Sequence, residues 1–345
     1  MKRLFRFDLI FPAAGIILFL LFPAPAAEGA RTGLKLCGEV LIPSLFPLSV
    51  LVCCAVRTGL SNWLSAKPFQ WLGRLLGLSE AGLLPVILGL AGGFPLGAQL
   101  LAEQFKLGSL TEEEAVRCSA LCNNAGPAFL LAVLGHQVFG SVPVGLALFF
   151  IQFLSLSFTG CLFQLRTPIP RRSAMDRIES RKRFSAAFPE ALGISAAAML
   201  RITGTVVFFS ALLSCLKAFL PLAALPAACQ TLLWGSIELS GSVSFLGKLP
   251  IWQAFPLASA LSSWGGLCVH MQAIQFLSEV RLPLRVYLTG KLLQAFFSAA
   301  LSCSLLLARA GTLLFLLPIF LILMIFLLSC RFWKKFHWKT GKAVV

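Results

Sequence analysis

The sequence predicts an all-α polytopic membrane protein with inverted-topology repeats, each containing a re-entrant hairpin and a broken helix. Three observations lead to this prediction. The composition is that of a bilayer protein, and glycine, proline, asparagine and serine interrupt four of the long apolar runs. The cations, in turn, gather in the segments between those runs.

The composition excludes an ordinary soluble domain. Of the 345 residues, 58% are hydrophobic and 12% are charged, and the mean hydropathy is +0.88. A soluble core of this size does not need so much apolar surface. The formal net charge of +16 does not indicate nucleic-acid binding, because the cations lie mainly between apolar runs, as in the cytoplasmic loops of membrane proteins. The eleven cysteines include no Cys-x-x-Cys pair and no clustered histidines, so neither a metal site nor a cofactor is expected.

The chain divides into two comparable halves joined by a basic linker, and each half is expected to contain a span, a hairpin, a broken span and a final span. The first residues, with early cations, an apolar run and a small-residue tail, fit a cleaved signal peptide or a short first span, and we favour the span. Thr111 and Glu114 have the spacing of a capping box, which predicts a helix start. The predicted segments are an N-terminal span or signal-like segment at 1–27, membrane repeat 1 at 37–165 with its hairpin at 83–102, a basic cytoplasmic linker at 166–189, membrane repeat 2 at 190–308 with its hairpin at 228–247, a C-terminal span at 312–330 and a cytoplasmic tail at 331–345.

The charges of the linker at 166–189 determine the expected topology. This segment carries seven cations and two acids. If each interrupted stretch at 83–102 and 228–247 crossed the membrane, a cytoplasmic N-terminus would put the linker outside, against the positive-inside rule. If each stretch is a hairpin that returns to its own side, the linker is cytoplasmic. The two halves then have opposite orientations, which is the architecture of many secondary transporters.

The four breaks are expected to meet near the middle of the membrane and to form a substrate site. Short half-helices present N–H groups and a positive dipole end, which suit an anionic or polar ligand, and the amides and hydroxyls add hydrogen-bonding groups. The competing interpretation is that these small residues only allow helices to pack closely. Four breaks in corresponding places favour the site. The expected substrate-binding residues are Gly92, Gly93, Pro95, Gly97, Asn123, Asn124, Gly126, Glu238, Ser240, Gly241, Ser263, Gly265, Gly266 and Arg201.

Four ionisable residues within the apolar runs carry specific expectations. Glu238 is expected to bind a coupling ion or proton, or to pair with Arg201 or Lys291, because a charge inside a membrane segment is costly and usually functional. Arg201 lies too far inside its span to snorkel easily and is expected to face an anion or Glu238. Lys291 is expected to snorkel to the cytoplasmic surface. His270, inside a broken span, is a candidate proton relay.

No set of nucleophile, base and oxyanion donors emerges from the sequence. It contains neither a Gly-x-Ser-x-Gly motif nor a Walker loop, and the serines near Glu238 have no histidine close to them in sequence. The chain is therefore not expected to be an enzyme.

The motifs at the breaks are Gly92-Gly93-Phe94-Pro95-Leu96-Gly97-Ala98, Leu121-Cys122-Asn123-Asn124-Ala125-Gly126-Pro127, Glu238-Leu239-Ser240-Gly241 and Gly265-Gly266-Leu267-Cys268-Val269-His270-Met271-Gln272. Together they resemble the YlbJ-type sporulation integral membrane proteins, which carry the nucleoside-recognition (Gate) domain seen in concentrative nucleoside transporters. The resemblance covers roughly 35–310. It implies a role in endospore formation at the outer forespore membrane, and transport of a small anion with dipicolinate as cargo.

Two functions from different classes are weighed. The favoured one is a transporter or facilitator of a small anionic or polar metabolite in a bacterial cell membrane. The alternative is a non-transporting scaffold for sporulation partners that uses the linker at 166–189 as a docking or anionic-lipid surface. Partners are the metabolite and the lipid bilayer, with no nucleic acid. Assembly into a homo-oligomer is left open.

Overall fold

The computed structural model describes residues 4–59, 67–166, 182–220 and 222–311. These residues are almost entirely helical and contain no β-strand, which confirms the predicted all-α class. The predicted span at 312–330, the tail at 331–345 and most of the linker lie outside them. Within this part of the chain, the helices long and apolar enough to cross a membrane are Pro23–Thr58, Val142–Gln164, Phe184–Phe219 and Leu284–Arg309, with a fifth candidate if the bent pair Gln70–Leu76 and Glu80–Gly92 is one span.

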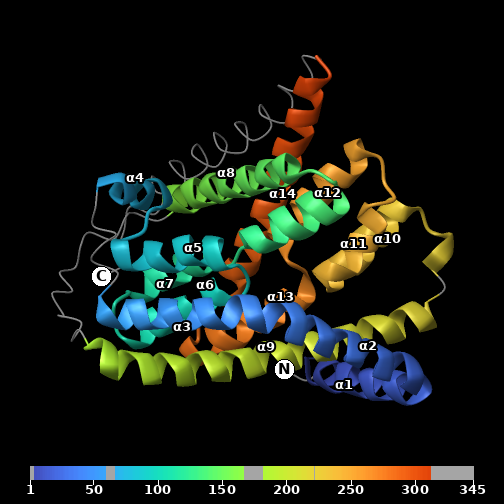
Figure 1. Cartoon of the computed structure of the whole chain (residues 1–345), viewed down its shortest axis with the longest axis horizontal. Coiled ribbons are helices and arrows are strands. Elements are labelled where there is room, and N and C mark those ends of the chain that lie inside the picture. The colour runs from blue at the N-terminus through green and yellow to red at the C-terminus, as the bar shows by residue number, and fades with distance from the viewer. Residues whose placement is uncertain (1–3, 60–66, 167–181, 221, 312–345) are drawn as a thin grey trace.

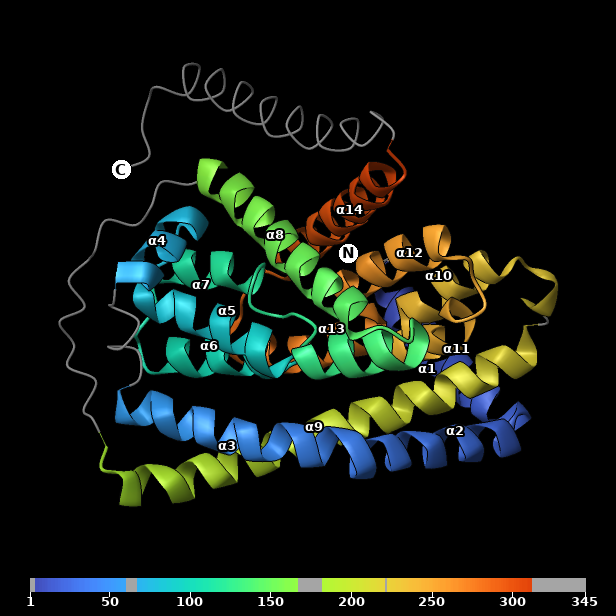
Figure 2. The same ribbon diagram turned by 45° about the horizontal axis from the view of Figure 1, so that its top comes forward.

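Two long helices lie side by side and form one face of the molecule (Figures 1 and 2). One is continuous through α2 (Pro23–Leu36), a π-helical turn (Cys37–Leu41) and α3 (Ile42–Thr58), and the other is α9 (Phe184–Phe219). They approach closely because α2 presents glycine: a Cβ on Gly29 would lie 2.4 Å from the backbone oxygen of Ser210. The prediction that the first of these helices starts at residue 37 is wrong, because the helix begins at Pro23. The predicted linker also ends earlier than expected, because residues 184–189 already belong to α9.

α1 (Leu4–Leu21) contains the apolar run of the predicted first span. It carries no polar stripe, and large side chains such as Leu20 and Phe11 are exposed at 74% and 68%. From Leu9 to Leu21 the helix is apolar on every side, which suits a lipid environment.

The first predicted hairpin is a pair of packed helices, α5 (Glu80–Gly92) and α6 (Leu96–Lys106), joined at Gly93–Pro95. The Ser79 hydroxyl caps α5 by accepting a hydrogen bond from the Gly82 N–H. α4 (Lys67–Leu76) precedes the pair and is bent by 93° relative to α5. The entry of this hairpin from one side of a membrane stays a prediction.

The broken span of the first half begins with α7 (Glu112–Ser119), where the Thr111 hydroxyl accepts a hydrogen bond from the Glu114 N–H at 3.3 Å, as the capping-box spacing predicts. The chain then leaves the helix and resumes as a π-helix, η3 (Ala128–Val138). The long helix α8 (Val142–Arg166) follows and packs against η3.

The second half of the chain is also built from helices separated by short breaks. After α9 and a short 3₁₀ turn, η4 (Leu222–Ala224), the elements are α10 (Ala227–Ile237), η5 (Leu239–Ser242), α11 (Val243–Leu246), α12 (Ile251–Trp264), α13 (Gly266–Leu277), η6 (Ser278–Val280) and α14 (Leu284–Arg309). A turn at Glu238 interrupts the second predicted hairpin, and Gly265 separates α12 from α13.

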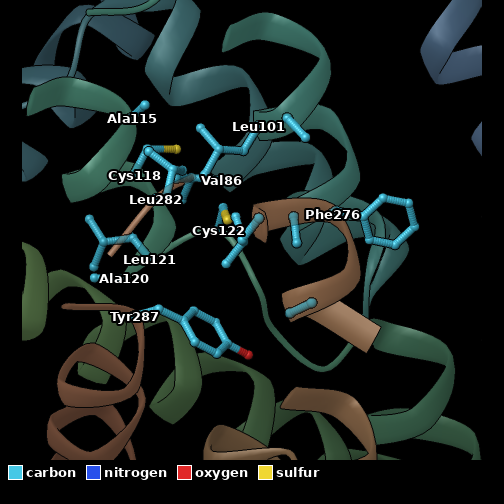
Figure 3. Packing of buried hydrophobic residues seen from close by; sticks show 14 of the residues in the cluster. Val86, Leu101, Ala115, Cys118, Ala120, Leu121, Cys122, Phe276, Leu282 and Tyr287 are labelled. Carbon is cyan, nitrogen blue, oxygen red and sulfur yellow. The ribbon is translucent and has the colours of Figure 1, made fainter. Parts of the chain in front are cut away.

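The largest apolar cluster joins the first hairpin to the elements that carry the second and fourth breaks. Figure 3 shows Val86 and Leu101 of the hairpin together with Leu121 and Cys122, while Phe276 of α13 and Tyr287 of α14 close the cluster from the other half. Most of these side chains are less than 2% exposed. Burial of this apolar surface holds segments far apart in the sequence together around the breaks.

Candidate binding site at the helix breaks

The first two breaks touch through their backbones. A Cβ on Gly93 would lie 2.9 Å from the backbone nitrogen of Gly126, and a Cβ on Gly97 would lie 1.7 Å from the carbonyl oxygen of Cys122. Gly89 approaches the same carbonyl from α5, at 2.1 Å. Only glycine allows these approaches. Gly93, Gly97 and Gly126 therefore serve the close packing of the two breaks, whatever else they do.

The other two breaks continue this contact. Gly265 has φ +93°, a conformation that favours glycine, and a Cβ there would lie 3.2 Å from the ring of Phe94 in the first break. A Cβ on Gly266 would lie 3.2 Å from the Ile237 carbonyl, one residue before Glu238. The four breaks therefore form one contiguous region. Pro95 joins it as the residue before α6, after a cis peptide bond, and Gly92 packs against Leu96.

A buried amine lies against the first and second breaks. Lys291 of α14 is 0% exposed, and its Nζ donates to the carbonyl oxygen of Asn123 and to Oε1 of Gln294, both at 2.6 Å. The Nζ also lies 5.9 Å from the centroid of the Phe94 ring. Within the described residues, no carboxylate forms an ion pair with Lys291. The prediction that Lys291 snorkels to the cytoplasmic surface is wrong, because its side chain is fully buried.

The two asparagines of the second break are held by side chains of the second half. Asn124 Oδ1 accepts a hydrogen bond from Gln294 Nε2 at 2.8 Å, and its Nδ2 donates to the Leu121 carbonyl at 2.7 Å. Asn123 Nδ2 donates to the Tyr287 hydroxyl at 3.0 Å. Both asparagines are 0% exposed, so this network replaces the helical hydrogen bonds that the break removes.

Tyr287 also connects the second break to α13. Its hydroxyl lies 2.9 Å from Nδ1 of His270, whose ring packs edge-on against Trp264 with centroids 4.1 Å apart. Two buried atoms of this chain of contacts, Asn123 Oδ1 and His270 Nε2, have no hydrogen-bond partner among the described residues. Buried polar atoms are nearly always paired, so these two atoms are available for a further hydrogen bond.

Ser263 belongs to a neighbouring hydroxyl cluster between α8, α12 and α14. Its Oγ lies 2.6 Å from Ser298 Oγ, which donates to Ser155 Oγ at 2.9 Å. All three serines are 0% exposed. The cluster ties the end of α12 to the two long helices behind it.

Glu238 is satisfied by its own turn. Its carboxylate accepts hydrogen bonds from the N–H groups of Ser240 and Gly241, at 3.2 and 2.9 Å, and from the Ser240 hydroxyl. It forms no ion pair with Arg201 or Lys291, so the expectation of such a pair is wrong. Glu238 here acts as the N-cap of the 3₁₀ turn that forms the third break.

Arg201 lies apart from the breaks. Its exposed side chain lines an open cleft of about 560 Å³ between α9 and the end of α13, and its guanidinium carbon lies 5.9 Å from the Phe276 ring centroid. The other residues of the cleft are Leu200, Gly204, Thr205, Phe208, Gln275 and Ser278. Arg201 is an expected site residue that the structure places away from the cluster.

Sequence reasoning missed the contribution of α14. Tyr287, Lys291, Gln294, Ser298 and Ser302 recur at helical spacing, and each is buried to 1% exposure or less. This polar stripe at i, i+4, i+7, i+11 and i+15 was the available signal, because polar side chains on one face of a membrane helix point toward the bundle interior. In the described part of the chain, no three His, Cys, Asp or Glu side chains form a group that could hold a metal ion.

Comparison with known proteins gives one informative relative. Over 312 residues, 80% of this chain and 76% of the other, the sequence is 22% identical to the sporulation integral membrane protein YlbJ of Bacillus subtilis (strain 168). No family model matches the chain, and no solved structure matches it. This similarity and the four to five candidate spanning helices support an integral membrane location.

Proposed function

We propose that the chain is a secondary transporter or facilitator of a small anionic metabolite, with its binding site where the four breaks meet. The observation that carries this proposal is Lys291, a fully buried amine whose hydrogen-bond acceptors within the described residues are two neutral oxygens. A buried charge without a counter-charge is costly unless a partner arrives to balance it. A small anion is such a partner.

The helix ends at the cluster favour the same ligand class. Phe94, just before α6, contacts Gly265, which directly precedes α13. The N-terminal ends of α6 and α13 therefore lie on either side of the Phe94 ring that the amine faces, and helix N-termini attract negative charge. Asn123 Oδ1 and His270 Nε2 add two polar atoms without a partner.

The architecture of alternating access is part of the proposal. In this proposal, α9, α10–α11, α12–α13 and α14 are the counterparts of α3, α5–α6, α7–η3 and α8. The corresponding helices α3 and α9 run in opposite directions, because Arg57 at the end of α3 meets Glu190 near the start of α9. Opposed counterparts support inverted-topology repeats, with α5–α6 and α10–α11 as hairpins entering from opposite sides.

The name of the relative extends the proposal to sporulation. We place the transporter in the outer forespore membrane of sporulating cells, with dipicolinate as the cargo to test first. A buried amine near two helix N-termini suits a dicarboxylate of this kind.

The test is uptake of labelled dipicolinate and of other small carboxylates by vesicles that contain the purified protein. Lys291→Ala and Asn123→Ala should lower uptake at least tenfold, while Lys35→Ala, which removes an exposed lysine of α2, should not change it. Membrane insertion is checked by the yield of folded protein. Uptake by the Lys291 and Asn123 variants at the unmodified rate would contradict the proposal.

The scaffold alternative has its own discriminating result. If the basic linker is a docking surface, deleting 167–181 should block spore maturation. Spores of the Lys291→Ala strain should then mature normally. The transporter proposal expects the reverse outcome, in which the deletion is tolerated and Lys291→Ala blocks maturation.

A further inference from the structure

The ligands of the Lys291 amine are those of a metal cation. Its Nζ is held by a backbone carbonyl from an unwound helix segment, Asn123, and by an amide oxygen, Gln294, each at 2.6 Å. Asn123 Oδ1, a third oxygen of the same segment, is buried and has no hydrogen-bond partner among the described residues. Neutral oxygens in this arrangement are the ligands that hard cations prefer.

The groups around the Lys291 nitrogen can stabilise a positive charge on it. Two of its protons are directed to the two oxygens, and the Phe94 ring lies 5.9 Å from the nitrogen. A protonated amine is stabilised by the two oxygen acceptors and by a cation–π contact with the ring, while its full burial opposes the charge. When protonated, the group at this position is a cation surrounded by neutral oxygens and an aromatic ring.

In secondary transporters with broken helices, unwound carbonyls hold the coupling Na⁺ or proton beside the substrate. We propose that the ammonium of Lys291 is a tethered cation that takes the place of such an ion, so that this site binds its anion without Na⁺. The inference rests on the proposed function and deepens it, because it assigns the charge that balances the substrate to the chain itself.

The proposal is tested on purified protein without any substrate. Apparent Tm is measured in NaCl and in N-methylglucamine chloride at equal ionic strength, together with binding of ²²Na⁺. The unmodified protein should show the same Tm in both salts and no saturable ²²Na⁺ binding. Saturable binding, or a rise in Tm of about 3 °C or more in NaCl, would overturn the proposal.

The variant Lys291→Ala removes the ammonium and leaves the oxygens of Asn123 and Gln294. It should gain a Na⁺-dependent rise in Tm of about 3 °C or more, since a ligand at ten times its Kd stabilises the state that binds it. Lys217→Ala is the matched control, because it removes a lysine that also lies over aromatic rings, Trp234 and Phe245, at 5.7 and 5.6 Å. This control should not respond to Na⁺.

Lys291→Arg keeps a cation at the position and should stay insensitive to Na⁺. A Lys291→Ala protein that folds and responds to neither Li⁺, Na⁺ nor K⁺ would overturn the proposal. If Lys291→Ala does not fold, the measurements of Tm and ²²Na⁺ binding on the unmodified protein and on Lys291→Arg still test the proposal, because Na⁺ binding by either protein would overturn it. Absence of uptake in vesicles would count against the proposed function alone, because the cation measurements do not depend on transport.

Discussion

Gly97 has no room for a side chain, since a Cβ there would lie 1.7 Å from the Cys122 carbonyl oxygen. Gly97→Ala should therefore force the hairpin away from the second break. The backbone cannot yield as a flexible side chain would, and we expect a loss of about 3 kcal/mol or more in folding free energy. Thermal unfolding of the detergent-purified protein measures this loss.

Gly193→Ala is the control for this change. Gly193 lies in α9 with nothing within 4 Å of a Cβ, so alanine should be neutral there or stabilise by up to about 1 kcal/mol through helix propensity. Equal stability of the Gly97 and Gly193 variants would show that the two breaks do not touch.

Residue types that interrupt a helix were predictable from the sequence, while their partners were not. Glycines and asparagines stand out inside an apolar run, because local backbone chemistry makes them weak there. Lys291 and Tyr287 are ordinary helical residues whose role depends on what α14 packs against. That information is tertiary, and only the polar stripe along α14 pointed to it.

At the scale of elements, Arg57 joins three helices. Its guanidinium binds Glu103 of α6 at 3.0 Å and Glu190 of α9 at 3.3 Å, and its side chain is 7% exposed. Arg57→Met leaves two carboxylates without their shared cation. We expect a loss of about 1–3 kcal/mol. The measurement is the apparent Tm of each variant in the same detergent.

The comparison variant is Lys182→Met. Lys182 also binds Glu190, at 2.5 Å, but both side chains are more than a third exposed, so water screens the pair and the loss should stay below about 1 kcal/mol. A larger loss for Lys182→Met than for Arg57→Met would show that burial does not set the strength of this network.

Hydropathy predicted the ends of helices correctly only where the whole helix is apolar. The sequence of α2 is too polar to read as part of a span, so the predicted helix started at residue 37. α2 is nevertheless helical from Pro23 because Gly29 and Gly33 let it pack onto α9. Proline at its first position also suits a helix start.

At the scale of the whole molecule, the charge distribution predicts the side on which the linker lies. Ser173 is within 166–189, outside the described residues. A single cysteine at position 173, in a chain freed of its other cysteines, should be protected from a membrane-impermeant thiol reagent in intact cells and labelled after lysis. Labelling in intact cells would overturn the hairpin topology and with it the inverted repeats.

The contact between the first two breaks has a mechanical consequence. The Cys122 carbonyl sits between Gly89 and Gly97, and Gly93 lies against Gly126, so the hairpin and the unwound segment cannot slide past each other. A conformational change must carry them as one rigid body. That body borders α3 and α9, and Phe94, Pro95 and Leu96 line a small void of about 10 Å³ there, beside Ser49.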